Sequence, residues 1–119
     1  MAYVDGFLLV VPNKNLKAYL AMARKASRIW KEYGALEYRE AVGDDLKAAW
    51  GLPFGKLTKL KEDETVVFAW IVYKTKAHRD QVNKKVMKDP RIQGMCDPKN
   101  PPFDMKRMSY GGFKIKVMS

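Results

Sequence analysis

Thr65-Val66-Val67-Phe68-Ala69-Trp70-Ile71-Val72-Tyr73 is the clearest strand of the chain, and the other elements can be placed around it. β-Branched and aromatic side chains fill this stretch almost completely, and these residues favour a pleated, half-buried backbone. Residues 3–11, 36–42 and 108–117 carry weaker strand patterns. The sequence therefore predicts a sheet of four strands.

The first predicted helix lies between the first two strands. Residues 16–33 place apolar side chains at three- and four-residue steps, the spacing of one helical face. Asn13 or Asn15 can cap its beginning, and Gly34 stands where a C′ glycine would end it. We expect this helix to pack one side against the sheet.

A second helix is expected from residue 76 to about residue 88, with Thr75 as its cap. Asp89-Pro90 closes it and can begin a further turn, because proline suits a first helical position. Residues 46–61 are interpreted as a long connection with a possible short strand near its end. The order β-α-β, connection, β-α-β with right-handed crossovers predicts an α+β ferredoxin-like plait, a four-stranded antiparallel sheet in a single domain over residues 1–119.

Helices on one face leave the other face of this sheet to be covered by something else. Alternation divides the third strand into Val67, Ala69 and Ile71 on one side and Phe68 and Trp70 on the other. We expect the smaller aliphatic side chains of the first and third strands to face the helices. Four large residues then remain on the uncovered face. These are Phe7, Leu9, Phe68 and Trp70. A face this apolar predicts a homodimer with two sheets packed together.

Composition limits the class of protein. Hydrophobic residues make up 47% and charged residues 30% of 119 residues, which is typical of a globular chain. No apolar run approaches the ~20 residues of a membrane span, and Asp5 stands where a signal peptide would be basic. The one cysteine suits a reducing compartment, so we expect a cytoplasmic protein.

The net charge of +10 raises nucleic acid as a partner. Most of the basic residues, however, follow the two predicted helices, where the solvent side of an amphipathic helix carries such charges in any case. Phe68 and Trp70 occupy alternate strand positions, as base-stacking residues of RNA-recognition modules do. The basic-glycine start of the usual RNA-binding strand motif is missing, and a dimer would close this face to bases.

The segment 101–113 concentrates polar groups where a proline-rich loop enters the last strand. Asp104, Lys106, Arg107 and Tyr110 are followed by the pair Gly111-Gly112. As a binding set, Arg107 and Tyr110 could hold an anionic ligand by paired donors and a hydroxyl. As a structural set, these side chains could pin the last strand to Asp5 or Asp104 across a dimer.

Tyr3-Val4-Asp5-Gly6-Phe7 at one end, and Pro102-Phe103-Asp104 through Gly112-Phe113 at the other, resemble the YbaA family of small bacterial proteins of unknown function. The resemblance continues through Gly43-Asp44-Asp45, Phe68-Ala69-Trp70-Ile71, Arg79-Asp80 and Asp89-Pro90-Arg91. It implies a dimeric α/β barrel, the assembly of small monooxygenases and stress-responsive barrel proteins. The chain departs from the family pattern in residues 46–61 and in its strong positive charge.

Asp5 is a candidate base if it is buried, or a structural acid paired with Lys106 or Arg107. Haem-degrading members of the barrel superfamily use an amide on the first strand, a tryptophan on the third and a histidine on the second helix. The resemblance to that superfamily makes Asp5, Trp70 and His78 a haem-site hypothesis, with a carboxylate in place of the amide and His78 in the first helical turn.

Three further candidates have simple structural interpretations. Asp44 and Asp45 could approach a hard cation, but a turn after Gly43 explains them with fewer assumptions. One histidine and one cysteine cannot supply a usual zinc ligand set, so no metal site is predicted. Cys96 has no base placed beside it by spacing and is taken as an ordinary thiol.

These observations predict a homodimeric small-molecule-binding protein or small enzyme with its site in the barrel cavity. No motif requires a cofactor, and whether the chain catalyses a reaction stays open. An RNA- or polyanion-binding protein and a haem-binding monooxygenase are the alternatives. The expected ligand-binding residues are Asp5, Phe7, Phe68, Trp70, Asp104, Lys106, Arg107 and Tyr110.

Overall fold

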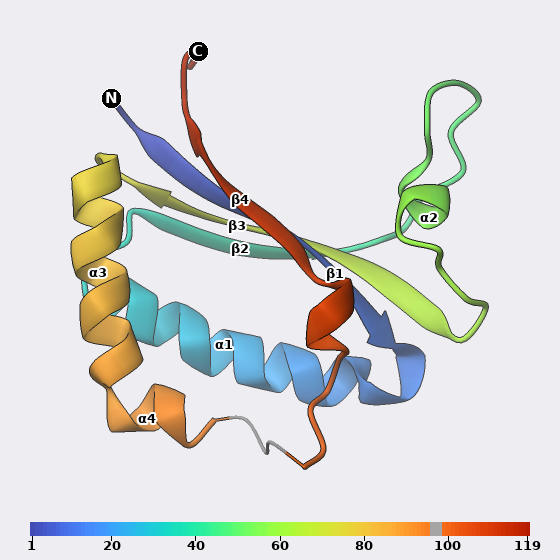
Figure 1. Ribbon diagram of the computed structural model, residues 1–119, viewed down its shortest axis with the longest axis horizontal. Coiled ribbons are helices and arrows are strands. Elements are labelled where there is room, and N and C mark those ends of the chain that lie inside the picture. The colour runs from blue at the N-terminus through green and yellow to red at the C-terminus, as the bar shows by residue number, and fades with distance from the viewer. Residues whose placement is uncertain (96–98) are drawn as a thin grey trace.

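The computed structural model describes residues 1–95 and 99–119 (Figure 1). Four strands and two long helices form its framework. In chain order the elements are β1 (Tyr3–Pro12), the 3-10 turn η1 (Asn13–Asn15), α1 (Leu16–Glu32), β2 (Glu37–Val42), α2 (Phe54–Leu57), β3 (Glu64–Tyr73), α3 (Lys76–Lys88), α4 (Pro90–Gln93), the 3-10 turn η2 (Met105–Arg107) and β4 (Ser109–Lys114).

The strands form one antiparallel sheet in the order β2-β3-β1-β4. Figure 1 shows α1, α3 and α4 on one side of this sheet, while the two chain ends and the connection containing α2 rise on the other side. The predicted α+β plait with a four-stranded antiparallel sheet is confirmed. None of the helices in the described part of the chain is both long and apolar enough to cross a membrane.

Several helix ends are fixed by the residues that the sequence singles out. The Thr75 side chain accepts a hydrogen bond from His78 N–H at 3.0 Å and begins α3. Asp89 ends α3 and caps α4, in which Pro90 is the first residue. Gly34 follows α1 with φ of 114°, a left-handed conformation that glycine adopts without strain. Asn15 occupies the cap position of α1, but its amide donates to Pro102 O at 3.2 Å instead of capping.

The long connection departs from the prediction in one respect. Residues 46–61 contain no strand; the four-residue helix α2 stands near their end. Pro53 occupies the N-cap position of α2, and Gly55 O within the helix accepts from Leu60 N–H at 2.9 Å. A proline that fixes φ and two closely spaced glycines favour such a turn over an extended segment.

The register of β1 against β3 corrects the predicted distribution of side chains. Phe7 is paired with Ala69 and Leu9 with Val67, and directly paired residues point to the same face. Ala69 and Val67 are buried under the helices as predicted, so Phe7 and Leu9 lie there too and not beside Phe68. The expectation that the smaller side chains of both strands face the helices is right for β3 and wrong for β1.

Large residues of β1 fit beneath the helices because their neighbours are small. Ala69 lies opposite Phe7 in the sheet, while Ala23 and Ala26 lie on the inner side of α1. Two apolar clusters result, one around Val11 and Val67 and one around Tyr73 and Val86. The space left between them is the pocket described next.

Candidate functional site

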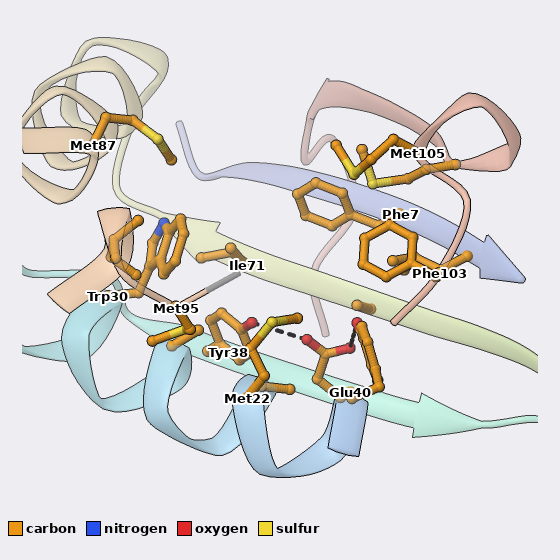
Figure 2. Close-up of a pocket in the computed structure, with 17 residues that line it drawn as sticks. Phe7, Met22, Trp30, Tyr38, Glu40, Ile71, Met87, Met95, Phe103 and Met105 are labelled. Atoms are coloured by element: carbon orange, nitrogen blue, oxygen red, sulfur yellow. Dashed lines mark hydrogen bonds between the residues drawn. The ribbon is translucent and has the colours of Figure 1, made fainter. Parts of the chain in front are cut away.

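An apolar pocket of about 450 Å³ lies between the sheet and the helical layer (Figure 2). Its walls come from β1, β2 and β3 on one side and from α1, α3 and α4 on the other, with the segment before β4 at one end. A pocket of this size is typical of sites for small organic molecules. Its larger lining residues include Phe7, Leu9, Met22, Trp30, Ile71 and Phe103.

Methionine is the dominant residue type of the lining. Five of the chain's seven methionines contribute to it: Met22, Met87, Met95, Met105 and Met108. Met87 and Met105 are more than half exposed, although both also contribute to the walls. An unbranched, polarizable side chain adapts to the shape of whatever it contacts, so this lining can fit more than one apolar outline.

Among the described residues of the lining, one carries a carboxyl group. Glu40 Oε1 accepts a hydrogen bond from Tyr19 OH at 2.7 Å, and Glu40 Oε2 accepts one from Tyr38 OH at 2.8 Å. Figure 2 shows the Glu40 carboxyl directed at the Tyr38 hydroxyl. Tyr38 and Glu40 reach the same side of β2 because alternate residues of a strand share a face, and α1 supplies Tyr19.

Burial controls the protonation of this group. Removal from water raises the pKa of the Glu40 carboxyl above its ordinary value, and the two tyrosine hydrogen bonds offset only part of that rise. Burial also raises the pKa of Tyr19 and of Tyr38, and the neighbouring Glu40 carboxylate adds to both shifts. The tyrosines therefore stay protonated and donate, while Glu40 is the group able to gain or lose a proton.

Trp30 lines the pocket, but its indole N–H is already bonded. It donates to Asn83 Oδ1 at 3.1 Å, and Tyr73 OH donates to the same oxygen at 3.2 Å. Trp30 therefore offers the pocket an aromatic surface and no hydrogen-bond donor.

Asp5 belongs to a structural network behind the pocket. Asp5 is buried, and its Oδ1 accepts from Arg79 Nη1 at 2.9 Å. Burial raises the pKa of Asp5, while Arg79 and then Asn83 act in the opposite direction. The Arg79 guanidinium also lies 4.9 Å from the centre of the Tyr3 ring. The predicted paired acid is present, but its partner is Arg79 of α3 and not Lys106 or Arg107.

Trp70 and Phe68 lie on the opposite face of the sheet from Asp5 and Phe7. The centroids of their rings lie 5.3 Å apart, and Trp70 Nε1 donates weakly to Glu37 Oε1 at 3.4 Å. The expected single site containing Asp5, Phe7, Phe68 and Trp70 is therefore wrong. Phe7 alone of these four lines the pocket.

The haem hypothesis needs Asp5, Trp70 and His78 around one ligand, and the fold separates them. His78 Nδ1 accepts from Lys74 N–H at 3.0 Å at the start of α3, and its Nε2 would lie 3.2 Å from a Cβ on Gly34. With Trp70 on the other face of the sheet, the three side chains do not converge.

The polar residues before β4 have structural partners. Arg107 donates to Glu64 at 2.6 Å and 3.1 Å and to the carbonyl oxygens of Thr58 and Lys59, both at 3.1 Å. Asp104 caps η2 by accepting from Lys106 N–H at 2.9 Å. Arg107 therefore holds the α2 connection. The structural interpretation of this segment expected Asp5 or Asp104 as the partner across a dimer, whereas within the chain Arg107 is bonded to Glu64 and to two carbonyl oxygens.

Lys106 and Tyr110 are both exposed. The Tyr110 ring stacks on Phe7 with centroids 5.8 Å apart, so it covers a side chain that also forms the pocket wall. Asp44 and Asp45 are exposed after β2, and the described residues hold no group of three metal-ligating side chains around them. Cys96 lies outside the described residues.

The central residue of the pocket, Glu40, was missed by the sequence reasoning. Two signals could have found it: the alternation Tyr38-Arg39-Glu40 in a predicted strand, and a helix whose apolar stripe includes Tyr19. Neither indicates that the three polar groups meet, because that contact depends on how α1 packs against β2.

Comparisons with known proteins place the chain in a family. Residues 2–105 match the family described as a protein of unknown function (DUF1428). The chain is 44% identical over 114 residues to the uncharacterized protein YbaA of Escherichia coli strain K12, and equally to that of Shigella flexneri, covering 96% of each chain.

Solved structures share the fold at low sequence identity. An uncharacterized NIPSNAP domain protein from Burkholderia xenovorans matches with a TM-score of 0.58 at 14% identity, over 98% of this chain and 97% of that one. A dimeric ferredoxin-like protein from an uncultured marine organism matches with a TM-score of 0.51 at 12% identity, over 100% and 99%. The structural matches support the ferredoxin-like fold, and by its sequence the chain belongs to the DUF1428 family, together with YbaA.

Proposed function

We propose that this protein binds a small, mainly apolar organic molecule in the pocket between the sheet and α1. The observation that carries the proposal is the Glu40 carboxyl, the one carboxyl among the described lining residues, held by two tyrosines in an otherwise apolar pocket of about 450 Å³. Apolar walls supply affinity and one polar group fixes orientation, which is the usual composition of a ligand site. The ligand would carry one hydrogen-bonding group directed at Glu40.

The proposal can be tested by the fluorescence of Trp30, which lines the pocket. Replacing Trp50 and Trp70 by phenylalanine leaves Trp30 as the one tryptophan of three. Titration with 4-nitrobenzyl alcohol, an apolar quencher with one hydroxyl, should give saturable quenching. Quenching that rises linearly without saturation would contradict the proposal.

A matched pair of α1 variants locates the binding. Ala26 is buried and lines the pocket, so Ala26→Leu should fill part of the space and weaken binding at least tenfold. Ala18 is exposed on the same helix, so Ala18→Leu should leave the titration unchanged. Equal curves for both variants would place the probe elsewhere.

We also propose the homodimer expected from the sequence. Its interface would be the sheet face that the helices do not cover. This face carries Phe68 at 46% and Phe113 at 61% exposure, with Leu8 and Trp70 between them partly exposed. Strand rise and spacing give the face roughly 500 Å² per copy, so two copies would bury about 1,000 Å². That value reaches the lower limit of a biological interface before other contacts are added.

The α2 connection adds apolar surface on the same side. Trp50 is 86%, Leu52 64% and Leu57 53% exposed, and Figure 1 shows this connection rising on the side of the sheet opposite the helices. The matching marine protein is described as dimeric, which agrees with the proposal. A second copy of the chain is therefore the proposed occupant of the open face.

The same face bears on the RNA alternative. Phe68 and Trp70 are on the open face and side by side, as stacking would need, but a sheet-to-sheet dimer would cover them. A monomer that binds single-stranded RNA with steep salt dependence would favour RNA over the dimer. The separation of Asp5 from Trp70 leaves the haem alternative without its site.

A further inference from the structure

We propose that Glu40 is a general base that removes a proton from carbon, and that its substrates are apolar carbonyl compounds with an acidic C–H beside the carbonyl. The inference rests on the proposed function, because the substrate is the molecule bound in the pocket. The C–H electron pair becomes the enolate, and the proton moves to a Glu40 carboxylate oxygen. When a C=C bond stands next to the acidic carbon, the enolate extends over it as a dienolate. Return of the proton to the far (γ) carbon then moves the double bond into conjugation with the carbonyl and restores the carboxylate, so no oxidant or reductant is needed.

The position of Glu40 suits this role because two spaces meet at its side chain. On the inner side is the apolar pocket. On the outer side, Glu40 and Tyr38 also line a surface hollow of about 320 Å³, together with Leu20, Arg24, Ser27 and Arg39. A carboxyl between an apolar substrate space and a polar hollow can take a proton from one side and exchange it with water on the other.

The two tyrosines leave the carboxylate able to react. Each Glu40 oxygen accepts one tyrosine hydroxyl, and a carboxylate oxygen has a second acceptor position. When one oxygen becomes protonated, its hydrogen bond from tyrosine weakens. The released hydroxyl of Tyr19 or Tyr38, both in the pocket lining, can then donate to the enolate oxygen. As negative charge passes from the carboxylate to the enolate oxygen, the tyrosine hydrogen bond would pass with it.

The groups facing Glu40 determine its titration. Tyr19 from α1 and Tyr38 from β2 face it directly, and Arg24 and Arg39 lie around the outer hollow. Ala69, its partner in β3, has no ionisable group. Burial raises the pKa of Glu40, which makes its carboxylate a stronger base than one in water.

The test uses 5-nitrobenzisoxazole, an apolar bicyclic probe with one acidic C–H. A base removes that proton, the C–H pair forms the nitrile, and the ring N–O bond breaks to release a coloured phenolate. The wild-type protein should accelerate this reaction with saturation, and the rate should rise with pH as one carboxyl ionises, with an apparent pKa above that of a free glutamate. Glu40→Gln should lower the rate constant at saturation at least 100-fold.

Two comparisons separate catalysis from structural effects. Glu62→Gln, in an exposed turn, should leave rate and pH profile unchanged. Tyr38→Phe removes one hydrogen bond to the carboxylate, so the pH profile should move to higher pH while the reaction persists. A merely structural role for Tyr38 would change stability and leave the midpoint of the profile where it is.

Binding of the probe is measured separately, by quenching of Trp30 in the variant without Trp50 and Trp70 at pH 5, where turnover is slow. Saturable quenching with equal rates for the wild type and Glu40→Gln would overturn the base and keep the proposed pocket. No saturable quenching would overturn both. Saturable quenching with loss of rate only in Glu40→Gln supports both.

Discussion

Arg79 Nη1 donates to Asp5 Oδ1 at 2.9 Å and so joins α3 to β1 across 74 residues of sequence. Both side chains are largely buried, with 18% and 5% exposure. A buried carboxylate that loses its partner is costly, whereas replacement of the whole pair can be nearly neutral.

Arg79→Met is therefore expected to lower the free energy of unfolding by about 3 kcal/mol, measured by urea denaturation. The double variant Asp5→Asn with Arg79→Met should recover a substantial part of this loss, because no charge then remains buried. The double variant could instead be less stable than Arg79→Met, by as much as an independent second substitution would cost. That result would show that the pairing with Arg79 is not what mainly stabilises Asp5.

Gly111 and Gly112 are predicted to respond oppositely to alanine. A Cβ on Gly112 would run into the ring of buried Tyr3, with Cε2 only 2.7 Å away, whereas a Cβ on Gly111 would lie 3.7 Å from the Phe113 ring. Gly112→Ala should lower stability by about 1–3 kcal/mol through overpacking. Gly111→Ala should be neutral or gain up to about 1 kcal/mol, because alanine loses less backbone entropy on folding. Thermal unfolding of the two variants gives the comparison, and similar losses would contradict it.

Arg107 is expected to control the order of the α2 connection more than global stability. Arg107→Lys keeps a charge near Glu64 but cannot reach the Thr58 and Lys59 carbonyls with one planar group. Backbone amides of Thr58 and Leu60 should then exchange with deuterium at least tenfold faster, while the unfolding midpoint changes little. Lys106→Ala, next in sequence and exposed, serves as the control and should leave exchange unchanged.

The raised pKa of Glu40 predicts a pH-dependent gain from Glu40→Gln. The folded state keeps the proton at a pH where the unfolded chain has lost it, so the wild type loses stability as the pH rises from the unfolded pKa to the folded one. The glutamine variant lacks this dependence. Its stability relative to the wild type should therefore increase across that range, by at most about 1.4 kcal/mol per pH unit, in denaturation measured from pH 4 to 8. A difference that is constant with pH would show that burial does not raise the Glu40 pKa.

The proposed dimer makes a prediction about one exposed phenylalanine. Phe68→Lys places a charge on the open face, so it should weaken the dimer at least 100-fold in sedimentation velocity. Leu36→Lys is a matched control, because Leu36 is 45% exposed against 46% for Phe68 but precedes β2 outside that face. Equal sedimentation of the two variants as dimers would place the interface elsewhere.

The four strands and the two long helices could be predicted from local sequence. Thr75 as a cap, Asp89-Pro90 as a break and restart, and Gly34 as a helix end all act through backbone geometry within a few residues. The strands could be predicted for the same reason, since β-branched and aromatic runs favour extension wherever they occur. The order of these elements then left few topologies, and the antiparallel plait was among them.

The candidate site could not be predicted in this way. Period-two alternation divides each strand into two sets, but it does not say which set of β1 shares a face with which set of β3. The pairing of Phe7 with Ala69 decides that, and it places Asp5 and Phe7 under the helices and Trp70 on the other face. Large side chains are accommodated there because alanines of α1 and β3 leave the room.

The sequence by itself determined the four strands, the two long helices and the order that makes a plait, because each of these depends on neighbours in the chain. Only the tertiary structure decided that Tyr19, Tyr38 and Glu40 meet, that Arg79 pairs with Asp5, and that Arg107 holds the α2 connection. Three of these contacts, Tyr19 with Glu40, Arg79 with Asp5 and Arg107 with Glu64, join residues 21 to 74 positions apart. Strand register and helix packing set such distances, and local preferences carry no information about either.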